Sequence, residues 1–167
     1  MPDSFTDAAL LLVGHGSTQN ADSGAPVFHQ AAELRRRGLF AVVREGFWKQ
    51  DPRLLDVVPQ IPQPRVFIVP IFISEGYFSE EVIPRALGFH LDSQGESGRL
   101  IERVGQRLFY CRSVGSHESL ACVLLARARQ VVGQFPFPRA PKPQDTTLFI
   151  AGHGTEQNEN SRKAIER

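Results

Sequence analysis

The sequence predicts an α/β fold in which a parallel β-sheet carries helices on both of its faces. Unbroken apolar runs, typical of strands buried on both faces, occupy residues 8–13 and 65–73. Segments with the apolar spacing of amphipathic helices separate the strand candidates, and this alternation implies parallel strands joined by crossover helices. A length of 167 residues, with 41% apolar and 22% charged residues, suits one α/β domain with its own core and a shorter remainder.

The order of the elements follows from these patterns and from the residues that begin and end helices. We expect strands at residues 8–13, 39–47, 65–73 and 107–112, and helices at residues 25–37, from residue 51, at 80–87 and at 118–132. Gly38 is expected to end the first helix, and Asp51 to cap the start of the second. Ser79 and Ser116 are the predicted N-caps of the third and fourth helices, and Pro84 shortens or kinks the third.

The fourth helix and the residues after it mark the end of the first domain. Its predicted inner face, turned toward the sheet, consists of Leu120, Val123, Leu124, Ala128 and Val131. Residues 134–146 contain four prolines and no periodic pattern, which predicts an inter-domain linker. Residues 147–151 form a fifth strand candidate.

A short motif occurs twice. Residues 148–161 repeat residues 10–23, and the identical residues of the first copy are Leu10, Gly14, His15, Gly16, Gln19, Asn20 and Ser23. The second copy places His153 where the first has His15. The repeat predicts a tandem domain duplication, with a first domain at residues 1–133, a linker at 134–146 and the start of a second, truncated domain at 147–167. An added edge strand, or an arm exchanged between protomers, is the alternative interpretation of residues 147–167.

Composition and charge exclude several classes of partner. The net charge of +1 provides no basis for binding nucleic acid or an anionic membrane, and no apolar run is long enough to span a bilayer. No signal peptide is visible at the N-terminus. Cys111 and Cys122 do not have metal-ligand spacing, so we expect reduced, packed cysteines in a cytoplasmic protein.

The functional residues are predicted at one edge of the sheet. The stretch Gly14-His15-Gly16-Ser17 follows the first strand, and residues 74–78 follow the third. Ligands of parallel sheets bind outside the carboxyl ends of the strands, so these two stretches are expected to share one rim.

A histidine between two glycines at such a rim has three interpretations. It can simply hydrogen-bond a turn. It can belong to a phosphate-handling enzyme, but neither an Arg before the His-Gly pair nor a P-loop or a G-x-S-x-G motif is present. It can also bind a metal and accept protons, because a neutral imidazole is both a good ligand for divalent metals and a base near neutral pH.

Several segments, taken in order, resemble the sirohydrochlorin cobaltochelatases, the small chelatases related to ferrochelatase. They are Leu-Val-Gly-His-Gly-Ser at residues 12–17, the strand ending Val-Pro-Ile-Phe-Ile at 69–73, Gly76, and Ile-Pro-Arg-Ala-Leu at 83–87. The resemblance covers residues 8–88 well, weakens over 105–133 and resumes at 147–161.

The resemblance implies a chelatase-like, flavodoxin-like three-layer sandwich with two similar halves that face one cleft. The second half would come from the same chain or from a homodimer. A divalent metal, Co²⁺ or Fe²⁺, would be inserted as a substrate into sirohydrochlorin or a related tetrapyrrole, with no organic cofactor evident. His15 would be a metal ligand and proton acceptor. The expected ring-binding residues are Gly16, Ser17, Phe72, Gly76, Tyr77 and Phe78, with Phe47 and Trp48 as further candidates for the apolar walls of the cleft.

The sequence departs from the family at one position. Members commonly carry Gly-x-His in the second segment, whereas this chain has Gly76-Tyr77-Phe78. A phenylalanine cannot bind a metal, so the second ligand would be His153 from the other half or a carboxylate, or this half would only shape the pocket. The candidate carboxylates are Glu75, Glu80 and Glu81, and helix stabilisation is the other interpretation of Glu80 and Glu81. Because of Phe78, a non-catalytic protein that binds tetrapyrrole or metal is the alternative to an enzyme.

Overall fold

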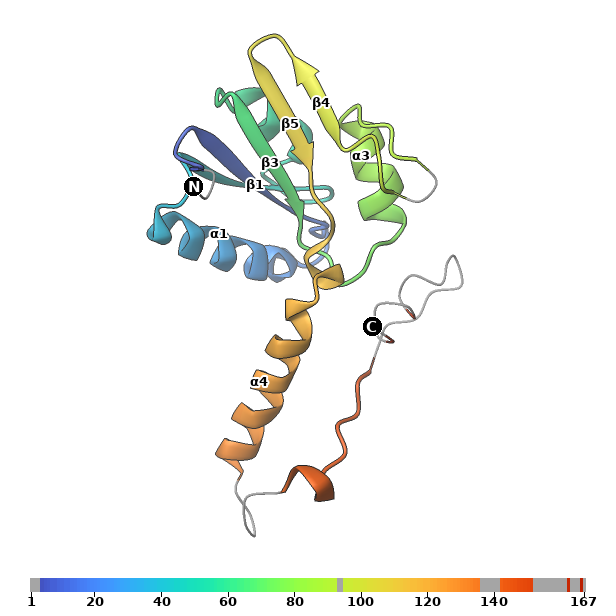
Figure 1. Ribbon diagram of the computed structural model, residues 1–167. Coiled ribbons are helices and arrows are strands. Elements are labelled where there is room, and N and C mark those ends of the chain that lie inside the picture. The colour runs from blue at the N-terminus through green and yellow to red at the C-terminus, as the bar shows by residue number, and fades with distance from the viewer. Residues whose placement is uncertain (1–3, 93–94, 136–141, 152–161, 163–165, 167) are drawn as a thin grey trace.

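The computed structural model describes residues 4–92, 95–135, 142–151, 162 and 166. Its strands are β1 (Ala8–Gly14), β2 (Val42–Phe47), β3 (Arg65–Pro70), β4 (Leu100–Arg103) and β5 (Gln106–Tyr110). Its α-helices are α1 (Ala25–Arg37), α2 (Leu54–Val57), α3 (Ile83–Ala86) and α4 (Ser119–Gln134). Short helical turns are η1 (Ala21–Gly24), η2 (Val58–Gln60), the π-helical η3 (Phe78–Val82), η4 (Val114–Ser116) and η5 (Pro143–Asp145). Figure 1 shows their arrangement.

The strands form one sheet in the order β2-β1-β3-β5-β4. β2, β1, β3 and β5 run parallel, which confirms the predicted α/β sheet, and β4 pairs antiparallel to β5. The sequence pattern missed β4, because four residues with two charges among them carry no clear strand signal. The strand forms because Gly105, at φ +73°, turns the chain back so that residues 100–103 pair with β5.

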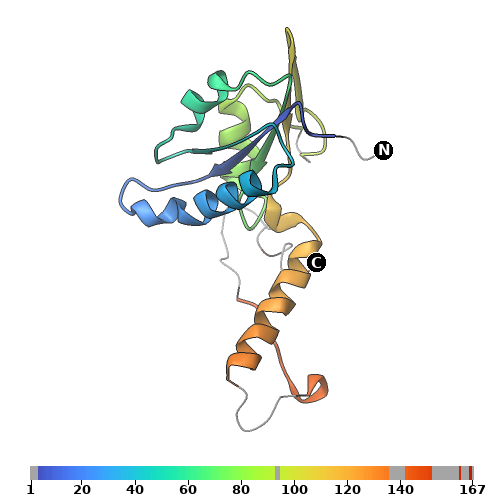
Figure 2. The ribbon, with the colours of Figure 1, turned by 90° about the vertical axis from the view of Figure 1, so that its left-hand side faces the viewer.

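Two apolar layers cover β1, which lies between β2 and β3. Alternate residues of β1 point to opposite faces: Ala9, Leu11 and Val13 pack toward α2 and α3, whereas Leu10 and Leu12 pack toward α1. Every residue of β1 is buried, as expected for a strand covered on both sides. Figure 2 shows α1 on one side of the sheet, with α2 and α3 on the other. This confirms the predicted three layers.

Helix starts were predicted less well than strands. Gly38 ends α1 in the left-handed conformation, at φ 64°, as expected. α2 begins only at Leu54, with Arg53 rather than Asp51 before it. The helix after β3 starts at Phe78, one residue before Ser79, and Ser79 is buried within it rather than capping it. Glu118, not Ser116, precedes α4. Asp51 and Ser116 lie in turns, for which their residue types are also suited, and Ser79 lies inside the π-helix.

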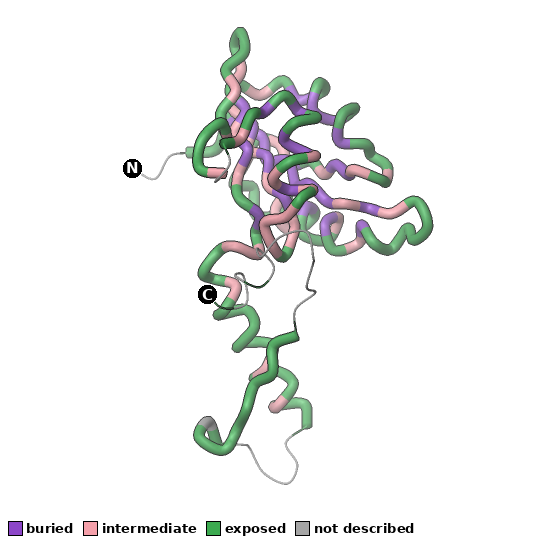
Figure 3. The backbone as a smooth tube through the Cα atoms, turned by 90° about the vertical axis from the view of Figure 1, so that its right-hand side faces the viewer, coloured by how far each residue is buried: buried purple, intermediate pink, exposed green. Residues whose placement is uncertain are grey.

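The predicted fourth helix exists as α4, but its predicted inner face is not packed on the sheet. None of its residues is buried, and Val123, Leu124 and Val131 are 52%, 41% and 55% exposed. The helix starts at the carboxyl edge of the sheet and runs away from it (Figures 1 and 3). The apolar spacing was therefore interpreted correctly as a helix and wrongly as a helix packed on this sheet.

The second copy of the motif lies mostly outside the described residues. Residues 147–151 are described and form no strand, which corrects the predicted fifth strand, because none of the strands that the structure describes pairs with them. Leu148, Phe149 and Ile150 are exposed. His153 lies outside the described residues. The division into domain, linker and duplicated domain stays a prediction.

Candidate functional site

His15 lies at the carboxyl end of β1, beside the segment that follows β3. The two strands are parallel neighbours, and the Ile71 amide donates to the carbonyl of Val13 at 2.8 Å just beyond them. The two stretches predicted to share a rim do lie at one edge of the sheet. Within the described part of the chain, no helix is long and apolar enough to cross a membrane.

The glycines on either side of His15 have a packing role. A Cβ on Gly14 would lie 2.8 Å from the Phe47 ring, and one on Gly16 would lie 2.5 Å from Cβ of Gln50. Gly16 also has φ +68°, which side-chain-bearing residues rarely adopt. The Gly-His-Gly motif thus lets the loop lie directly against the end of β2, and this is a structural reason for both glycines.

The end of β2 fixes the backbone of the histidine. The Trp48 amide donates to the carbonyl of Gly14 at 3.1 Å, and the Lys49 amide donates to the carbonyl of His15 at 2.8 Å. These two bonds hold the backbone at His15 against the segment that follows β2 before any ligand arrives.

The imidazole of His15 has one nitrogen engaged. Nδ1 lies 2.9 Å from the carbonyl oxygen of Gly16. A carbonyl can only accept, so Nδ1 is the donor and carries the proton of the neutral ring. The lone pair is then on Nε2, which is the atom that can bind a metal or take up a proton. The side chain is half-buried.

Phe78 packs against this imidazole. The two ring centroids lie 4.5 Å apart with an interplanar angle of 82°, an edge-to-face contact. Tyr77 packs edge to face on Phe78 with centroids 5.7 Å apart, and Tyr77 itself is 49% exposed. Position 78, where the family's motif has its histidine, is thus in contact with His15, and in this chain it presents a phenyl ring there.

Buried hydrogen bonds hold Phe78 in place. Ser79 Oγ accepts from the Gly76 amide at 2.9 Å, and the buried Tyr110 hydroxyl donates to the Ser79 carbonyl at 2.6 Å. Phe78 opens a π-helical turn, a conformation often found at functional sites. Gly76 therefore has a role in positioning the turn.

The carboxylates proposed as substitute ligands are engaged elsewhere or exposed. Glu75 pairs with Arg112 at 3.1 Å, and Glu80 pairs with Arg99 at 2.5 Å. Glu81 is exposed on the π-helical turn. Among the described residues, no three His, Cys, Asp or Glu side chains form a group that could hold a metal ion. Within that part of the chain, His15 therefore belongs to no group of three such side chains.

Burial acts on the Glu80 carboxyl. It raises the pKa of that group, because burial disfavours the charged form, and the nearby Arg99 only partly opposes this effect. Glu80 Oε1 is buried without a hydrogen-bond partner. The Glu80–Arg99 pair links the π-helical turn to the residue just before β4.

The other predicted ring-binding residues differ in exposure. Ser17 Oγ accepts from the amides of Gln19 and Asn20, both at 3.1 Å, so it shapes the turn after His15. Phe72 and Trp48 are half-buried against the core. Phe47 is 1% exposed, so it belongs to the core and cannot form a wall of an open cleft.

Sequence reasoning missed Lys49. Its Nζ lies 5.8 Å from the centroid of the Phe78 ring, so its ammonium group lies beside the His15–Phe78 pair. The available signal was its position just after the predicted second strand, at the same edge as His15. Only aromatic residues were considered there.

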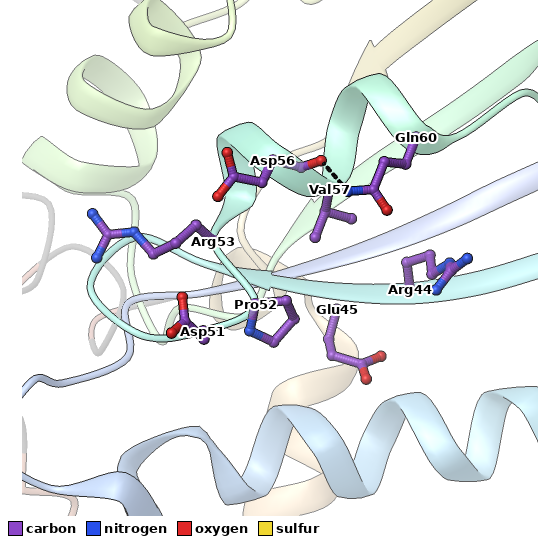
Figure 4. Close-up of a pocket in the computed structure, with 8 residues that line it drawn as sticks. All are labelled: Arg44, Glu45, Asp51, Pro52, Arg53, Asp56, Val57 and Gln60. Carbon is purple, nitrogen blue, oxygen red and sulfur yellow. Dashed lines mark hydrogen bonds between the residues drawn. The ribbon is translucent and has the colours of Figure 1, made fainter.

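A pocket of about 270 Å³ lies elsewhere, between the end of β2 and α2 (Figure 4). It is lined by Arg44, Glu45, Asp51, Pro52, Arg53, Asp56, Val57 and Gln60. None of these is a predicted site residue. This pocket is therefore separate from the candidate site at His15.

The comparison with protein families agrees with this geometry. The family model described as CbiX matches residues 9–131, which span the sheet, the histidine rim and most of α4. The chain belongs to the CbiX family.

Individual relatives of this CbiX chain carry consistent names. A probable sirohydrochlorin cobaltochelatase of Halobacterium salinarum is 41% identical over 94% of this chain and 56% of its own length. A sirohydrochlorin cobaltochelatase of Methanocaldococcus jannaschii is 32% identical over 51% of this chain and 62% of its own length. This chain thus spans less than two thirds of either relative.

A solved structure shares the fold of this CbiX chain. It is a multi-domain protein of Deinococcus radiodurans, described as structurally similar to chelatases with two additional novel domains. The likeness has a TM-score of 0.74 and 32% sequence identity, and it covers 95% of this chain and 34% of that protein. The chelatase-like fold is therefore confirmed.

Proposed function

We propose that this chain is part of a metal chelatase that inserts a divalent metal ion, Co²⁺ in the first place, into sirohydrochlorin or a related tetrapyrrole. Membership of the CbiX family and the names of the relatives support this reaction class. The single structural observation that carries the proposal is the bond between Nδ1 of His15 and the Gly16 carbonyl at the carboxyl edge of the sheet, which leaves the lone pair of the ring on Nε2. Fe²⁺ is the alternative metal substrate.

The chemistry of insertion suits a histidine placed in this way. A chelatase must hold its metal with few protein ligands, so that the pyrrole nitrogens can replace them. It must also accept the protons that leave the pyrrole N–H groups. The Nε2 atom of His15 can do both in turn: it binds the metal first and takes up one of the two pyrrole protons once the metal has moved into the ring, while the other proton leaves to the solvent. Nδ1 stays bonded to Gly16 and keeps the ring oriented.

The surroundings of His15 fit the proposed ring. Phe78 and Tyr77 offer apolar surface beside the imidazole, and a flat macrocycle can stack on such surface. The ammonium group of Lys49 lies next to them and would pair with carboxylate side chains of the tetrapyrrole. Phe72 and Ser17 are also proposed to contact the tetrapyrrole, on either side of these residues.

A second chelatase-like half would complete the site. His153 is its proposed contribution, by equivalence with His15 in the repeated motif. That half comes either from a continuation of the same chain or from a second copy. Without it, one imidazole faces the ring from this side only.

The alternative is a protein that binds the tetrapyrrole or the metal without inserting one into the other. The observation that favours it is Phe78, which replaces a possible second ligand by a phenyl ring in contact with His15.

The test is a Co²⁺-insertion assay with sirohydrochlorin, followed by the change in the absorption spectrum of the ring, on wild-type protein and on His15→Ala. We expect the variant to insert cobalt at least about 100-fold more slowly, the low end for loss of a general base. His29→Ala, which removes an exposed histidine of α1, is the matched control and should keep the wild-type rate. A variant as fast as wild type would rule out His15 as the catalytic group. Wild-type protein that binds the ring but inserts no metal would favour the alternative.

A further inference from the structure

Arg99, the residue just before β4, joins three separate segments of the chain. Its side chain is only 15% exposed, although it carries a charge. Nε donates to the carbonyl of Gly95 at 2.7 Å, Nη1 donates to the carbonyl of Cys111 at 3.2 Å, and Nη2 pairs with Glu80 Oε2 at 2.5 Å. The guanidinium group therefore connects the loop before β4 and the end of β5 with the π-helical turn.

The loop before β4 and the ring of Tyr110 enclose this guanidinium group. Gly95 has φ +66°, and a Cβ at this position would lie 3.0 Å from Glu80 Oε2 and 3.2 Å from Arg99 Nη2. The backbone of the loop thus lies directly against the Glu80–Arg99 pair, and a side chain at this position would obstruct that approach. The guanidinium carbon also lies 5.8 Å from the centroid of the Tyr110 ring. The guanidinium group is therefore held in one place by bonds and by packing.

The carboxylate that Arg99 holds belongs to the same π-helical turn as Phe78. Glu80 lies two residues after Phe78, and side chains two residues apart in a helical turn do not share a face. The Phe78 ring packs on His15 with centroids 4.5 Å apart, whereas the Glu80 carboxylate pairs with Arg99. If the bond to Glu80 is lost, the turn can rotate about its own axis, and this rotation moves the phenyl ring away from His15.

The other bonds of the turn do not fix its rotation. The Tyr110 hydroxyl holds the turn at a single backbone atom, the carbonyl oxygen of Ser79. The bonds between Ser79 Oγ and the backbone of Gly76 lie within the segment itself and move with it. One point of attachment leaves rotation about that point open. The bond from Arg99 to Glu80 supplies a second point, and two points together define the orientation of the turn.

We propose that Arg99 is a positioning residue of the candidate site: it sets the orientation of the π-helical turn and thereby the contact of Phe78 with His15. It acts through Glu80 and not by touching the metal or the tetrapyrrole. A guanidinium group suits this role because its rigid fork donates in several fixed directions, which a lysine ammonium group on a flexible stem cannot reproduce. The inference rests on the proposed function, in which Phe78 provides apolar surface for the tetrapyrrole.

The first experiment measures the contact between Phe78 and His15 in the ligand-free 167-residue chain by NMR spectroscopy. In wild type, nuclear Overhauser effects are expected between protons of the two rings, because the ring centroids lie only 4.5 Å apart. In Arg99→Met, which removes the guanidinium group, we expect these signals to be lost and the His15 ring resonances to move to their positions in Phe78→Leu. Folded Arg99→Met protein that keeps the wild-type signals would overturn the proposal.

Two further variants make this result specific. Arg99→Met leaves the Glu80 carboxylate without its cation, at a cost in stability, so circular dichroism is used to establish that it is folded. Arg99→Lys keeps the charge; if Arg99→Met does not fold, wild-type signals in Arg99→Lys overturn the proposal. The matched control is Arg35→Met, because Arg35 donates to the Val43 carbonyl at 2.9 Å and pairs with Glu45, between α1 and β2. Loss of the signals in this control as well would contradict a specific role of Arg99.

The second experiment connects this contact with binding of the tetrapyrrole. The dissociation constant of metal-free sirohydrochlorin is measured by the change in its fluorescence, and that of Co²⁺ by isothermal titration calorimetry. We expect Arg99→Met to weaken sirohydrochlorin binding about tenfold, a typical coupling between residues of one network, and to leave Co²⁺ binding unchanged. A double variant that also carries Phe78→Ala should bind sirohydrochlorin no more weakly than Phe78→Ala alone, because Arg99 acts through the phenyl ring.

The outcomes of the second experiment separate this inference from a merely structural role and from the proposed function. A merely structural role of Arg99 would weaken the binding of both ligands and would add to the effect of Phe78→Ala, and either result would overturn the proposal. Wild-type protein that does not bind sirohydrochlorin would contradict the proposed function. The first experiment, which needs no ligand, would then decide the role of Arg99 by itself.

Discussion

The imidazole of His15 and the phenyl ring of Phe78 meet edge to face, with centroids 4.5 Å apart and planes 82° apart. The first comes from the end of β1 and the second from the π-helical turn after β3. Position 78 therefore decides whether this half of the molecule offers one metal-binding side chain or two.

Phe78→His is predicted to build a two-histidine site. A second imidazole at this position would contact His15, so two neutral nitrogens could bind one Co²⁺ ion. We expect the Co²⁺ affinity to rise at least tenfold, which is about 1.4 kcal/mol, by isothermal titration calorimetry. Phe78→Leu should leave the affinity unchanged, and the gain should vanish in the double variant that also carries His15→Ala. An unchanged affinity in Phe78→His would contradict the geometry.

Gly16→Ala is predicted to destabilise the fold more than Gly105→Ala. Both glycines have positive φ, +68° and +73°, so either substitution carries a backbone cost of about 1–2 kcal/mol. Only at Gly16 does the new methyl also meet a neighbour, Cβ of Gln50 at 2.5 Å, whereas nothing lies within 4 Å at Gly105. Overpacking should add about 1–3 kcal/mol to the loss of unfolding free energy, measured by urea denaturation. Equal losses would mean that the loop can move away from β2.

Tyr110→Phe is predicted to weaken the support of the π-helical turn. The Tyr110 hydroxyl is buried and donates to the Ser79 carbonyl at 2.6 Å. Its removal leaves a buried acceptor without a partner, at a cost of about 1–3 kcal/mol in unfolding free energy. Tyr77→Phe removes a hydroxyl from a half-exposed ring and should cost far less. If the two variants unfold at the same urea concentration, the buried bond does not support the turn.

Glu80→Gln and Glu33→Gln are predicted to change the pH dependence of stability in opposite directions. Burial raises the pKa of Glu80 above its ordinary value of 4.5. The folded state then binds the proton more tightly than the unfolded state. Wild type is therefore expected to be more stable than Glu80→Gln at low pH and to lose this extra stability as pH rises through 4.5 and above. The Arg36 and Arg37 side chains lower the pKa of Glu33 to about 2. Wild type should therefore be more stable than Glu33→Gln above pH 4.5 and lose this extra stability as pH falls.

The measurement is the thermal midpoint of wild type and both variants between pH 3 and pH 7, a range that brackets the ordinary glutamate pKa. The result to compare is whether the difference in thermal midpoint between wild type and each variant grows or shrinks as pH rises. An advantage of wild type over Glu80→Gln that grows with pH would mean that the Arg99 pair outweighs burial.

The strands were predictable because their signal is local. The run before Gly14 and the run before Pro70 are apolar throughout, and only a covered parallel sheet accommodates such runs. β4 was not predictable in this way, because its four residues form a strand only by pairing with β5. Helix caps were mispredicted at Asp51, Ser79 and Ser116, since short polar side chains serve turns as readily as helix starts.

The location of the candidate site in the fold was predictable from the sequence. The set of side chains that form the site was less predictable. The motifs around His15 and Gly76 both follow strands, and parallel strands bring their carboxyl ends to one edge. Lys49 was missed because its approach to Phe78 depends on how β2 ends. Phe47 was misassigned to the cleft wall, since the sequence does not tell on which side of the rim a ring is buried.

By itself, the sequence determined the α/β class, the two faces of β1, the glycine-flanked histidine at a strand end and the repeat of that motif. These features depend on neighbouring residues and on side-chain periodicity. Only the tertiary structure decided that Phe78 contacts His15, that Nδ1 of His15 is engaged, and that α4 leaves the sheet with none of its residues buried. These depend on the packing of segments far apart in the chain, which no local pattern specifies.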